Sequence, residues 1–161
     1  MATNGKTGWF RRWLSRDRSI PLDPARTDLH VVASSFDDAE PCSTALERGA
    51  QRKGWLEDEE IVLRHHLILP PDMIDDAAAI AAQDGYEQAP GSMTVESPEI
   101  TGYQPAVEGG VPLILQRVQV LDTLHCSQER SRMAGLAQRR GGIVLGWDAL
   151  QPASGTGSVA D

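Results

Sequence analysis

The sequence predicts an α+β domain in which the elements follow one another as strand, helix, strand, strand, helix, strand. Two observations predict this class. Apolar runs of strand length stand at 60–69, 111–121 and 143–150, and segments with helical start and stop signals separate them. The chain has 161 residues, of which 40% are hydrophobic and 24% are charged. This composition is typical of one globular domain.

The first strand is predicted over 60–69, with the sequence EIVLRHHLIL. Neighbouring residues of a strand point to opposite faces of a sheet. We therefore expect Leu63 and His65 on one face, and Arg64 and His66 on the other.

The first helix is predicted directly after this strand. Pro71 suits a first helical turn, the acidic residues that follow it complement the helix dipole, and Gly85 stands where a left-handed residue ends a helix. Residues 86–97 are predicted as a broken strand. Residues 98–110, which are rich in Pro and Gly, are predicted as a loop.

The second half of the domain repeats the pattern. Residues 111–121 form a strong strand, Asp122 or Thr123 caps a helix that runs to about Arg140, and 143–150 form the last strand. This order favours the ferredoxin-like split β-α-β fold, a four-stranded antiparallel sheet with two helices on one face. Its first and third strands are expected in the middle, because their apolar runs are the strongest.

The segments outside this domain have a different composition. Within an N-terminal extension, 29–36 are predicted as a short strand and 44–53 as a helix that ends at Gly54. The whole chain is expected to divide into a flexible basic segment and linker (1–28), the extension (29–59), the ferredoxin-like domain (60–150) and a flexible tail (151–161).

The net charge of −8 is unevenly distributed along the chain. Residues 1–18 hold five Lys or Arg and one Asp, a balance of +4, and residues 19–161 hold ten Lys or Arg and 22 Asp or Glu, a balance of −12. An acidic body repels nucleic-acid phosphates and attracts basic partners. We therefore expect no direct nucleic-acid binding, and a protein partner with a basic segment.

The apolar and cysteine patterns point to the cytoplasm. No apolar run reaches the 18 residues of a membrane-spanning helix, and the basic start is not followed by the apolar run of a secretory signal. Cys42 and Cys126 cannot form a disulfide framework, which fits a reducing compartment.

The N-terminal tip, residues 9–16 (WFRRWLSR), places apolar and basic side chains at helical spacing. A segment of this kind rests weakly on an anionic membrane surface or binds a groove of a partner. A disordered tip is the alternative, because a helix of two turns gains little stability alone. The candidate surface-binding residues are Trp9, Phe10, Arg11, Arg12 and Trp13.

Residues 60–150 resemble a known family in three places. The sequence RHHLILP (64–70) leads into an acidic, Ala-rich helix that ends in Asp-Gly-Tyr at 84–86, and LQRVQVLD (115–122) precedes a polar helix. The third place is a closing signature made of Leu136, Ala137, Gly141, Gly142, Gly146, Trp147 and Asp148. The block thereby resembles the regulator of ribonuclease activity B family, acidic inhibitors of a ribonuclease E-type endoribonuclease.

The resemblance implies a ferredoxin-like domain without a catalytic site, which lowers RNA turnover by binding the nuclease. The family usually has an aromatic residue and an acid before the Gly-Trp pair, where this chain has Val144 and Leu145. Any contact that this acid makes in the family is therefore absent here. The alternative is a generic interaction or scaffold domain, tethered by its N-terminus, whose partner is unrelated to RNA.

The spacing of reactive residues does not indicate a catalytic or metal site. His65 and His66 point to opposite faces of a strand, and His125 and Cys126 diverge by about 100° on a helix. The sequence has no H-x₃-H or C-x₂-C spacing and no phosphate-binding Gly-rich loop. We therefore expect no enzymatic activity, no metal and no cofactor.

A ferredoxin-like sheet can also bind RNA by stacking bases on exposed aromatic side chains. The open face of the sheet is predicted to carry a small basic patch of Arg64, His66, Arg117 and Gln119. The two central strands carry no Phe, Tyr or Trp, which argues against this mode of binding.

Two acidic runs are candidate docking surfaces for a basic partner, at opposite ends of the first strand and roughly 30 Å apart. A solvated surface is the alternative interpretation. Trp147 is a further candidate contact, although a large aromatic residue in a strand normally packs in the core. The candidate partner-binding residues are Glu57, Asp58, Glu59, Glu60, Asp72, Asp75, Asp76, Trp147 and Asp148.

Overall fold

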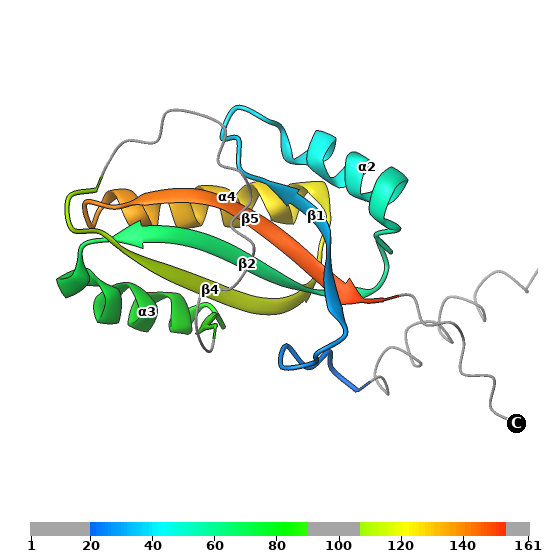
Figure 1. Cartoon of the computed structure of the whole chain (residues 1–161), viewed down its shortest axis with the longest axis horizontal. Helices are drawn as coiled ribbons and strands as arrows, with labels where there is room; N and C mark the ends of the chain where they lie inside the picture. The colour runs from blue at the N-terminus through cyan, green and yellow to red at the C-terminus, as the bar shows by residue number, and fades with distance from the viewer. Residues whose placement is uncertain (1–19, 90–106, 154–161) are drawn as a thin grey trace, which may run out of the picture.

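The computed structural model describes residues 20–89 and 107–153 and has an α+β fold, a five-stranded antiparallel sheet with three α-helices (Figure 1). The N-terminal tip lies outside the described residues. The elements are β1 (Leu29–Ser35), α2 (Cys42–Lys53), β2 (Glu60–Leu69), a short 3₁₀ helix (Pro71–Met73), α3 (Ile74–Gln83), β3 (Glu87–Gln88), β4 (Val111–Val120), α4 (Thr123–Gln138) and β5 (Ile143–Pro152).

The strands lie in the order β1-β5-β2-β4-β3. β2 pairs with β4 along its whole length, from Glu60 opposite Val120 to Leu69 opposite Val111, and with β5 on its other side. Among the four strands predicted for 60–150, β2 and β4 are therefore the inner pair. This is the position that their long apolar runs predict.

The predicted count of four strands and two helices is wrong by one strand and one helix. β1 pairs with β5, from Leu29 opposite Pro152 to Ser35 opposite Trp147, and α2 packs against β1. The local patterns at 29–36 and 44–53 do predict these two elements. They do not predict the pairing partner, because any uncovered strand edge offers the same row of backbone donors and acceptors.

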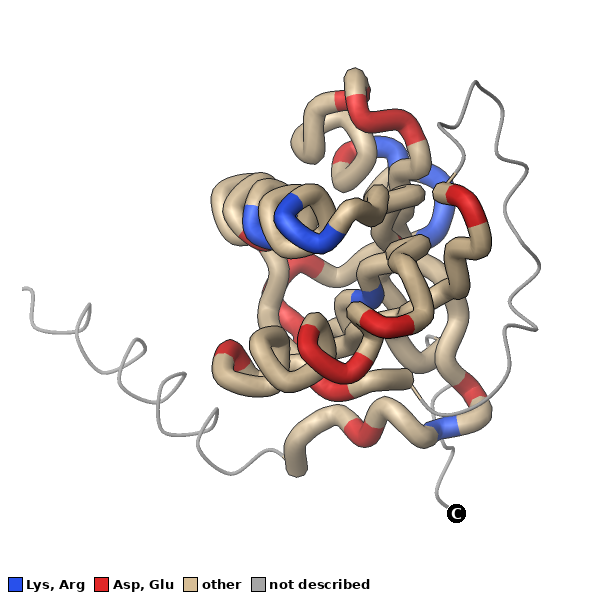
Figure 2. The backbone as a smooth tube through the Cα atoms, turned by 90° about the vertical axis from the view of Figure 1, so that its left-hand side faces the viewer, with Lys and Arg blue, Asp and Glu red and all other residues tan. Residues whose placement is uncertain are grey.

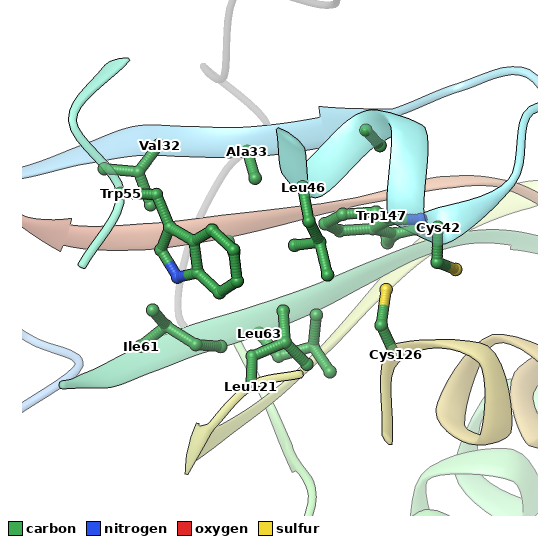
Figure 3. Packing of buried hydrophobic residues seen from close by; sticks show 12 residues of the cluster. Val32, Ala33, Cys42, Leu46, Trp55, Ile61, Leu63, Leu121, Cys126 and Trp147 are labelled. Atoms are coloured by element: carbon green, nitrogen blue, oxygen red, sulfur yellow. The ribbon is translucent and has the colours of Figure 1, made fainter. Parts of the chain in front are cut away.

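The three helices cover one face of the sheet, which we call the helix face. It carries Leu63, Leu67 and Leu69 of β2, and side chains of all three helices pack on these residues. One core cluster joins the sheet to α2 and the start of α4 (Figure 3). The second joins it to α3 and the end of α4 through Ala77, Ala81, Met133, Leu136 and Ala137.

A glycine allows α2 to lie close to β1. A Cβ atom at Gly49 would lie 2.3 Å from the carbonyl oxygen of Val32 and 2.9 Å from the Cβ of Ala33. Real Cβ atoms do not come so close to backbone oxygen, so a larger residue would push the helix off the strand. The helix ends as predicted at Gly54, whose φ of 71° lies in the left-handed region.

The other predicted helix signals are also present. The Asp122 side chain accepts a hydrogen bond of 2.7 Å from the His125 N–H and caps α4. Pro71 begins the 3₁₀ helix before α3, and Gly85 has a φ of 81°. Of the broken strand predicted at 86–97, only β3 is paired within the described part, and residues from 90 onward lie outside it.

The predicted basic patch does not form, because two of its residues lie on the other face. Arg117 is paired opposite Leu63 and Gln119 opposite Ile61, so both share the helix face. Arg64 and His66 do lie on the opposite face. The prediction placed Arg117 and Gln119 on the same face as Arg64 and His66. The strand register instead pairs Arg117 with Leu63.

Candidate functional site

A groove of about 560 Å³ lies between α2, the loop after it, and the junction of β4 with α4. Its apolar lining is made of Leu46, Trp55, Val120 and Leu121. Its acidic lining is made of Glu47, Glu57, Asp58 and Asp122, and the described residues that line it include no Lys, Arg or His. We call this surface the acidic groove.

The floor of the acidic groove is part of the hydrophobic core. Leu46, Trp55 and Leu121 are buried and belong to the cluster shown in Figure 3. Val120 and the neighbouring Leu56 remain 39% and 51% exposed, so apolar surface is available to a partner. A floor held by the core keeps its shape, which limits the entropy that is lost on binding.

The acidic side chains lie at the rim of the groove. Asp122 bonds both the backbone and the ring Nδ1 of His125, the latter at 2.7 Å, and these bonds hold its pKa below the ordinary value. Glu47 accepts a bond of 3.3 Å from Gln51 on the same helix. Several carboxylates around one apolar floor attract a cationic segment.

The first predicted acidic run lies at this groove only in part. Glu57 and Asp58 line it, whereas Glu59 is exposed outside the lining. Glu60 is half-buried, and its Oε2 accepts a bond of 2.7 Å from the Leu22 N–H. Glu60 thus holds the chain that precedes β1.

The second predicted run lies at the other end of β2. Asp72 is in the 3₁₀ helix, and Asp75 and Asp76 are in the first turn of α3. Asp76 forms an ion pair of 2.7 Å with Arg140, and the other two are exposed. Figure 2 shows acidic positions on several separate segments of the backbone.

Trp147 and Asp148 are buried, with 1% and 2% of their surfaces exposed, which corrects their prediction as surface contacts. The reason is the additional strand β1. Because β1 pairs with β5 on the side away from β2, β5 is not an edge strand. Trp147 therefore packs in the core on the helix face, and Asp148 lies within an ion cluster on the opposite face.

This ion cluster joins β2 and β5. Arg64 donates two hydrogen bonds of 2.7 Å to the two carboxylate oxygens of Asp148, and His66 Nε2 lies 3.1 Å from Oδ2. Burial acts to raise the pKa of Asp148, but the bonds from His66 and Arg64 outweigh it and lower the pKa. The Phe36 ring lies 5.3 Å from the His66 ring.

A second polar cluster is buried on the helix face. The Tyr86 hydroxyl donates a bond of 2.6 Å to Glu129 Oε2 and lies 3.4 Å from His65 Nε2. Arg117 lies over the Tyr86 ring, 4.8 Å from its centroid, and 3.3 Å from Glu129 Oε1. Burial, followed by the nearby His66, lowers the pKa of His65 to about 3, so this ring is neutral at physiological pH.

This second cluster contains acid–base groups but is closed to reactants in this conformation. Only 1% of His65 and 3% of Tyr86 are exposed, and neither lines the acidic groove. Burial and the bond to Glu129 also raise the pKa of Tyr86 above its ordinary value. The cluster therefore holds α4 and the end of α3 against the sheet, with the His65 ring neutral and the Tyr86 hydroxyl protonated.

Metal-binding groups and membrane-spanning helices are both absent from the described residues. Within 20–89 and 107–153, no group of three or more His, Cys, Asp or Glu is placed to hold a metal ion. No helix in those ranges has the length and apolar character needed to cross a bilayer. Cys42 and Cys126 are free, buried thiols that point toward each other between α2 and α4 (Figure 3).

Comparison with known proteins gives no match: no family model, no curated protein and no solved structure matches the chain. The site is therefore assigned from its geometry. Sequence reasoning missed Leu46, Glu47, Val120 and Asp122, because they come from three elements that only the fold brings together.

Proposed function

We propose that this protein is a non-enzymatic, acidic regulator that binds a basic, partly apolar segment of a partner protein in the acidic groove. The observation that carries the proposal is an apolar floor surrounded by four carboxylates. A partner segment gains affinity from apolar side chains that reach Trp55 and Val120, and association speed from its positive charge.

The proposal includes the ferredoxin-like arrangement for β2 to β5 with α3 and α4. The strand order β5-β2-β4-β3 supports it, because a split β-α-β unit has its first and third strands in the middle. β1 and α2 are additions to this unit, and α2 with the loop after it forms one wall of the groove.

The partner we propose is a ribonuclease E-type endoribonuclease, whose RNA cleavage the protein lowers by direct contact. The residues of 60–150 that resemble the regulator of ribonuclease activity B family support this choice, and so does the acidic body with its balance of −12. A cytoplasmic location belongs to the same proposal, because both cysteines are free thiols.

The test is RNA cleavage by a purified ribonuclease E-type enzyme, with and without the full-length protein. A groove variant, Glu47→Lys with Glu57→Lys, reverses two rim charges but leaves the α4 cap Asp122 intact. We expect it to weaken inhibition about tenfold or more, mainly through slower association. Inhibition by the wild-type protein should also weaken as salt rises from 0.05 to about 0.3 M, because exposed charges are screened.

The matched control is Asp72→Lys with Asp75→Lys, the same charge change at the start of α3. We expect inhibition to stay within about twofold of wild type, after a folding check for the small loss of helix-dipole stabilisation. If this control abolishes inhibition and the groove variant does not, the docking surface is the α3 run. If wild type leaves cleavage unchanged but the groove binds other basic proteins, the generic interaction domain is correct.

A further inference from the structure

The two cysteines of the chain lie far apart in the sequence, and the fold brings them together. Cys42 is the first residue of α2, and Cys126 lies near the start of α4. Both belong to the core cluster that joins these helices, with 4% and 2% of their surfaces exposed. In Figure 3 the two side chains extend toward each other from α2 and α4.

A second contact holds the same two segments side by side. Arg130 lies one helical turn after Cys126 on α4, and it donates a hydrogen bond of 2.6 Å to the Glu40 carbonyl and one of 2.9 Å to the Asp37 carbonyl. Glu40 stands two residues before Cys42. The backbone around each thiol is therefore fixed near the other, which is the arrangement from which a disulfide forms.

The two thiols differ in their readiness to react. Burial, followed by a hydrogen bond to Cys42, raises the pKa of the Cys126 thiol, so its reactive thiolate is disfavoured. Asp122 caps the start of α4, whereas Pro41 gives the start of α2 no side-chain cap. An uncapped first turn opens more readily, so Cys42 is the thiol that reacts first with an external oxidant.

We propose that Cys42 and Cys126 form a redox site that closes reversibly to an intramolecular disulfide and so ties α2 to α4. The inference needs only these two helices and does not rest on the proposed partner. Free thiols are the resting state. In reducing compartments disulfides are usually transient and act in redox sensing.

The oxidant that we propose is a low-molecular-weight disulfide such as glutathione disulfide. The Cys42 thiolate attacks one of its sulfur atoms, which forms a mixed disulfide and releases one glutathione. The Cys126 thiolate then attacks the Cys42 sulfur, which forms the bond between the two cysteines and releases the second glutathione. The protein thiols lose two electrons and two protons, and the two glutathione molecules take them up. Excess glutathione reverses both steps.

The bond ties together two sides of the acidic groove. Ser43, which directly follows Cys42, lines the groove on α2, and Asp122 lines it at the junction of β4 with α4. The Asp122 carbonyl accepts the Cys126 N–H at 2.9 Å. A covalent link next to both residues limits how far α2 can move away from α4. We therefore expect the oxidised protein to be the more stable form.

The test incubates the full-length protein with glutathione disulfide, blocks the remaining thiols with N-ethylmaleimide and measures the intact mass. We expect a species about 2 Da lighter than the reduced chain that takes up no N-ethylmaleimide, and peptide mapping should link Cys42 to Cys126. Excess glutathione should restore both thiols. The melting temperature of the oxidised form should be about 5–10 °C higher, because the bond closes a long loop of the unfolded chain.

The matched controls are Cys42→Ala and Cys126→Ala, each checked for folding by its urea midpoint. Neither should gain thermal stability from glutathione disulfide, because neither can form the bond. Cys126→Ala should accumulate the mixed disulfide at Cys42, about 305 Da heavier than the free chain. Absence of this species would overturn the first step of the proposed reaction.

The urea-unfolded wild-type chain is the control for the reagent, because its exposed thiols should form the same link. If the unfolded chain forms the disulfide and the folded chain does not, the two cysteines only fill the core and the inference is wrong. Disulfide-linked dimers in place of the internal bond would also overturn it. An oxidised form that is no more stable than the reduced form would show that the bond does not fit the fold.

Discussion

His65 and His66 are neighbours in the sequence, but the two faces of the sheet give them opposite surroundings. His65 lies between Leu115 of β4 and Trp147 of β5 on the helix face, and its Nδ1 has no hydrogen-bond partner within the described part of the chain. His66 lies on the opposite face and contacts the carboxylate of Asp148 at 3.1 Å.

The comparison shows that cross-strand neighbours, and not residue type, decide how a buried polar group is accommodated. On the helix face burial dominates and keeps His65 neutral, because a charged ring there would lose its water. On the opposite face the pKa of Asp148 is lowered despite burial, because His66 and Arg64 supply hydrogen bonds and Arg64 carries a positive charge. Three predictions test this difference.

The largest expected effect is on the ion cluster. Asp148→Ala leaves the partly buried Arg64 guanidinium and the His66 ring without the carboxylate that both contact. We expect the free energy of unfolding to fall by about 3–5 kcal/mol, measured by urea denaturation, because an uncompensated buried charge is costly. The double variant Arg64→Leu, Asp148→Leu should regain most of the loss. A cost below about 1 kcal/mol for Asp148→Ala would show that the cluster is solvated.

The second prediction is a pH dependence that comes from His65. The native ring takes up a proton only near pH 3, whereas the unfolded chain takes it up near pH 6.5. The unfolded state binds more protons between these values, so stability falls as pH falls through this window. From pH 7 to pH 5 we expect a loss of about 2 kcal/mol from this group.

His65→Leu should remove this part of the pH dependence in urea denaturation measured from pH 7 to pH 5. The Tyr86 hydroxyl that faces His65 stays protonated in this window, since burial and the bond to Glu129 raise its pKa. The control His125→Gln changes an exposed ring and should keep the slope. An unchanged slope in His65→Leu would mean that the ring is protonated in the folded protein.

The smallest effect concerns the hydroxyl on the helix face. Tyr86→Phe removes the bond of 2.6 Å to Glu129, which keeps its contact with Arg117 at 3.3 Å. We expect a loss of about 1 kcal/mol, since one charged partner remains. A double-mutant cycle with Glu129→Gln isolates this bond, and additive losses would contradict a direct interaction.

The sequence alone determined where most elements begin and end, because the signals are local. Gly54 and Gly85 adopt the left-handed backbone expected of them, Asp122 caps α4, and the apolar runs at 60–69 and 111–120 form the inner strands. The acidic character of Glu57 and Asp58 was also evident from the sequence. These features depend on backbone conformation and on residues only a few positions apart, so a short stretch of sequence is enough to predict them.

Only the tertiary structure decided which strands pair, in which register, and which helix packs on them. The position of β1 beside β5 buried Trp147 and Asp148, the register of β4 placed Arg117 on the helix face, and α2 brought Glu47 to Val120 across the groove. Each outcome depends on contacts between residues tens of positions apart. Strand edges and apolar faces are alike in their local chemistry, so the pairing is selected by how all of them pack together, and no single segment contains that information.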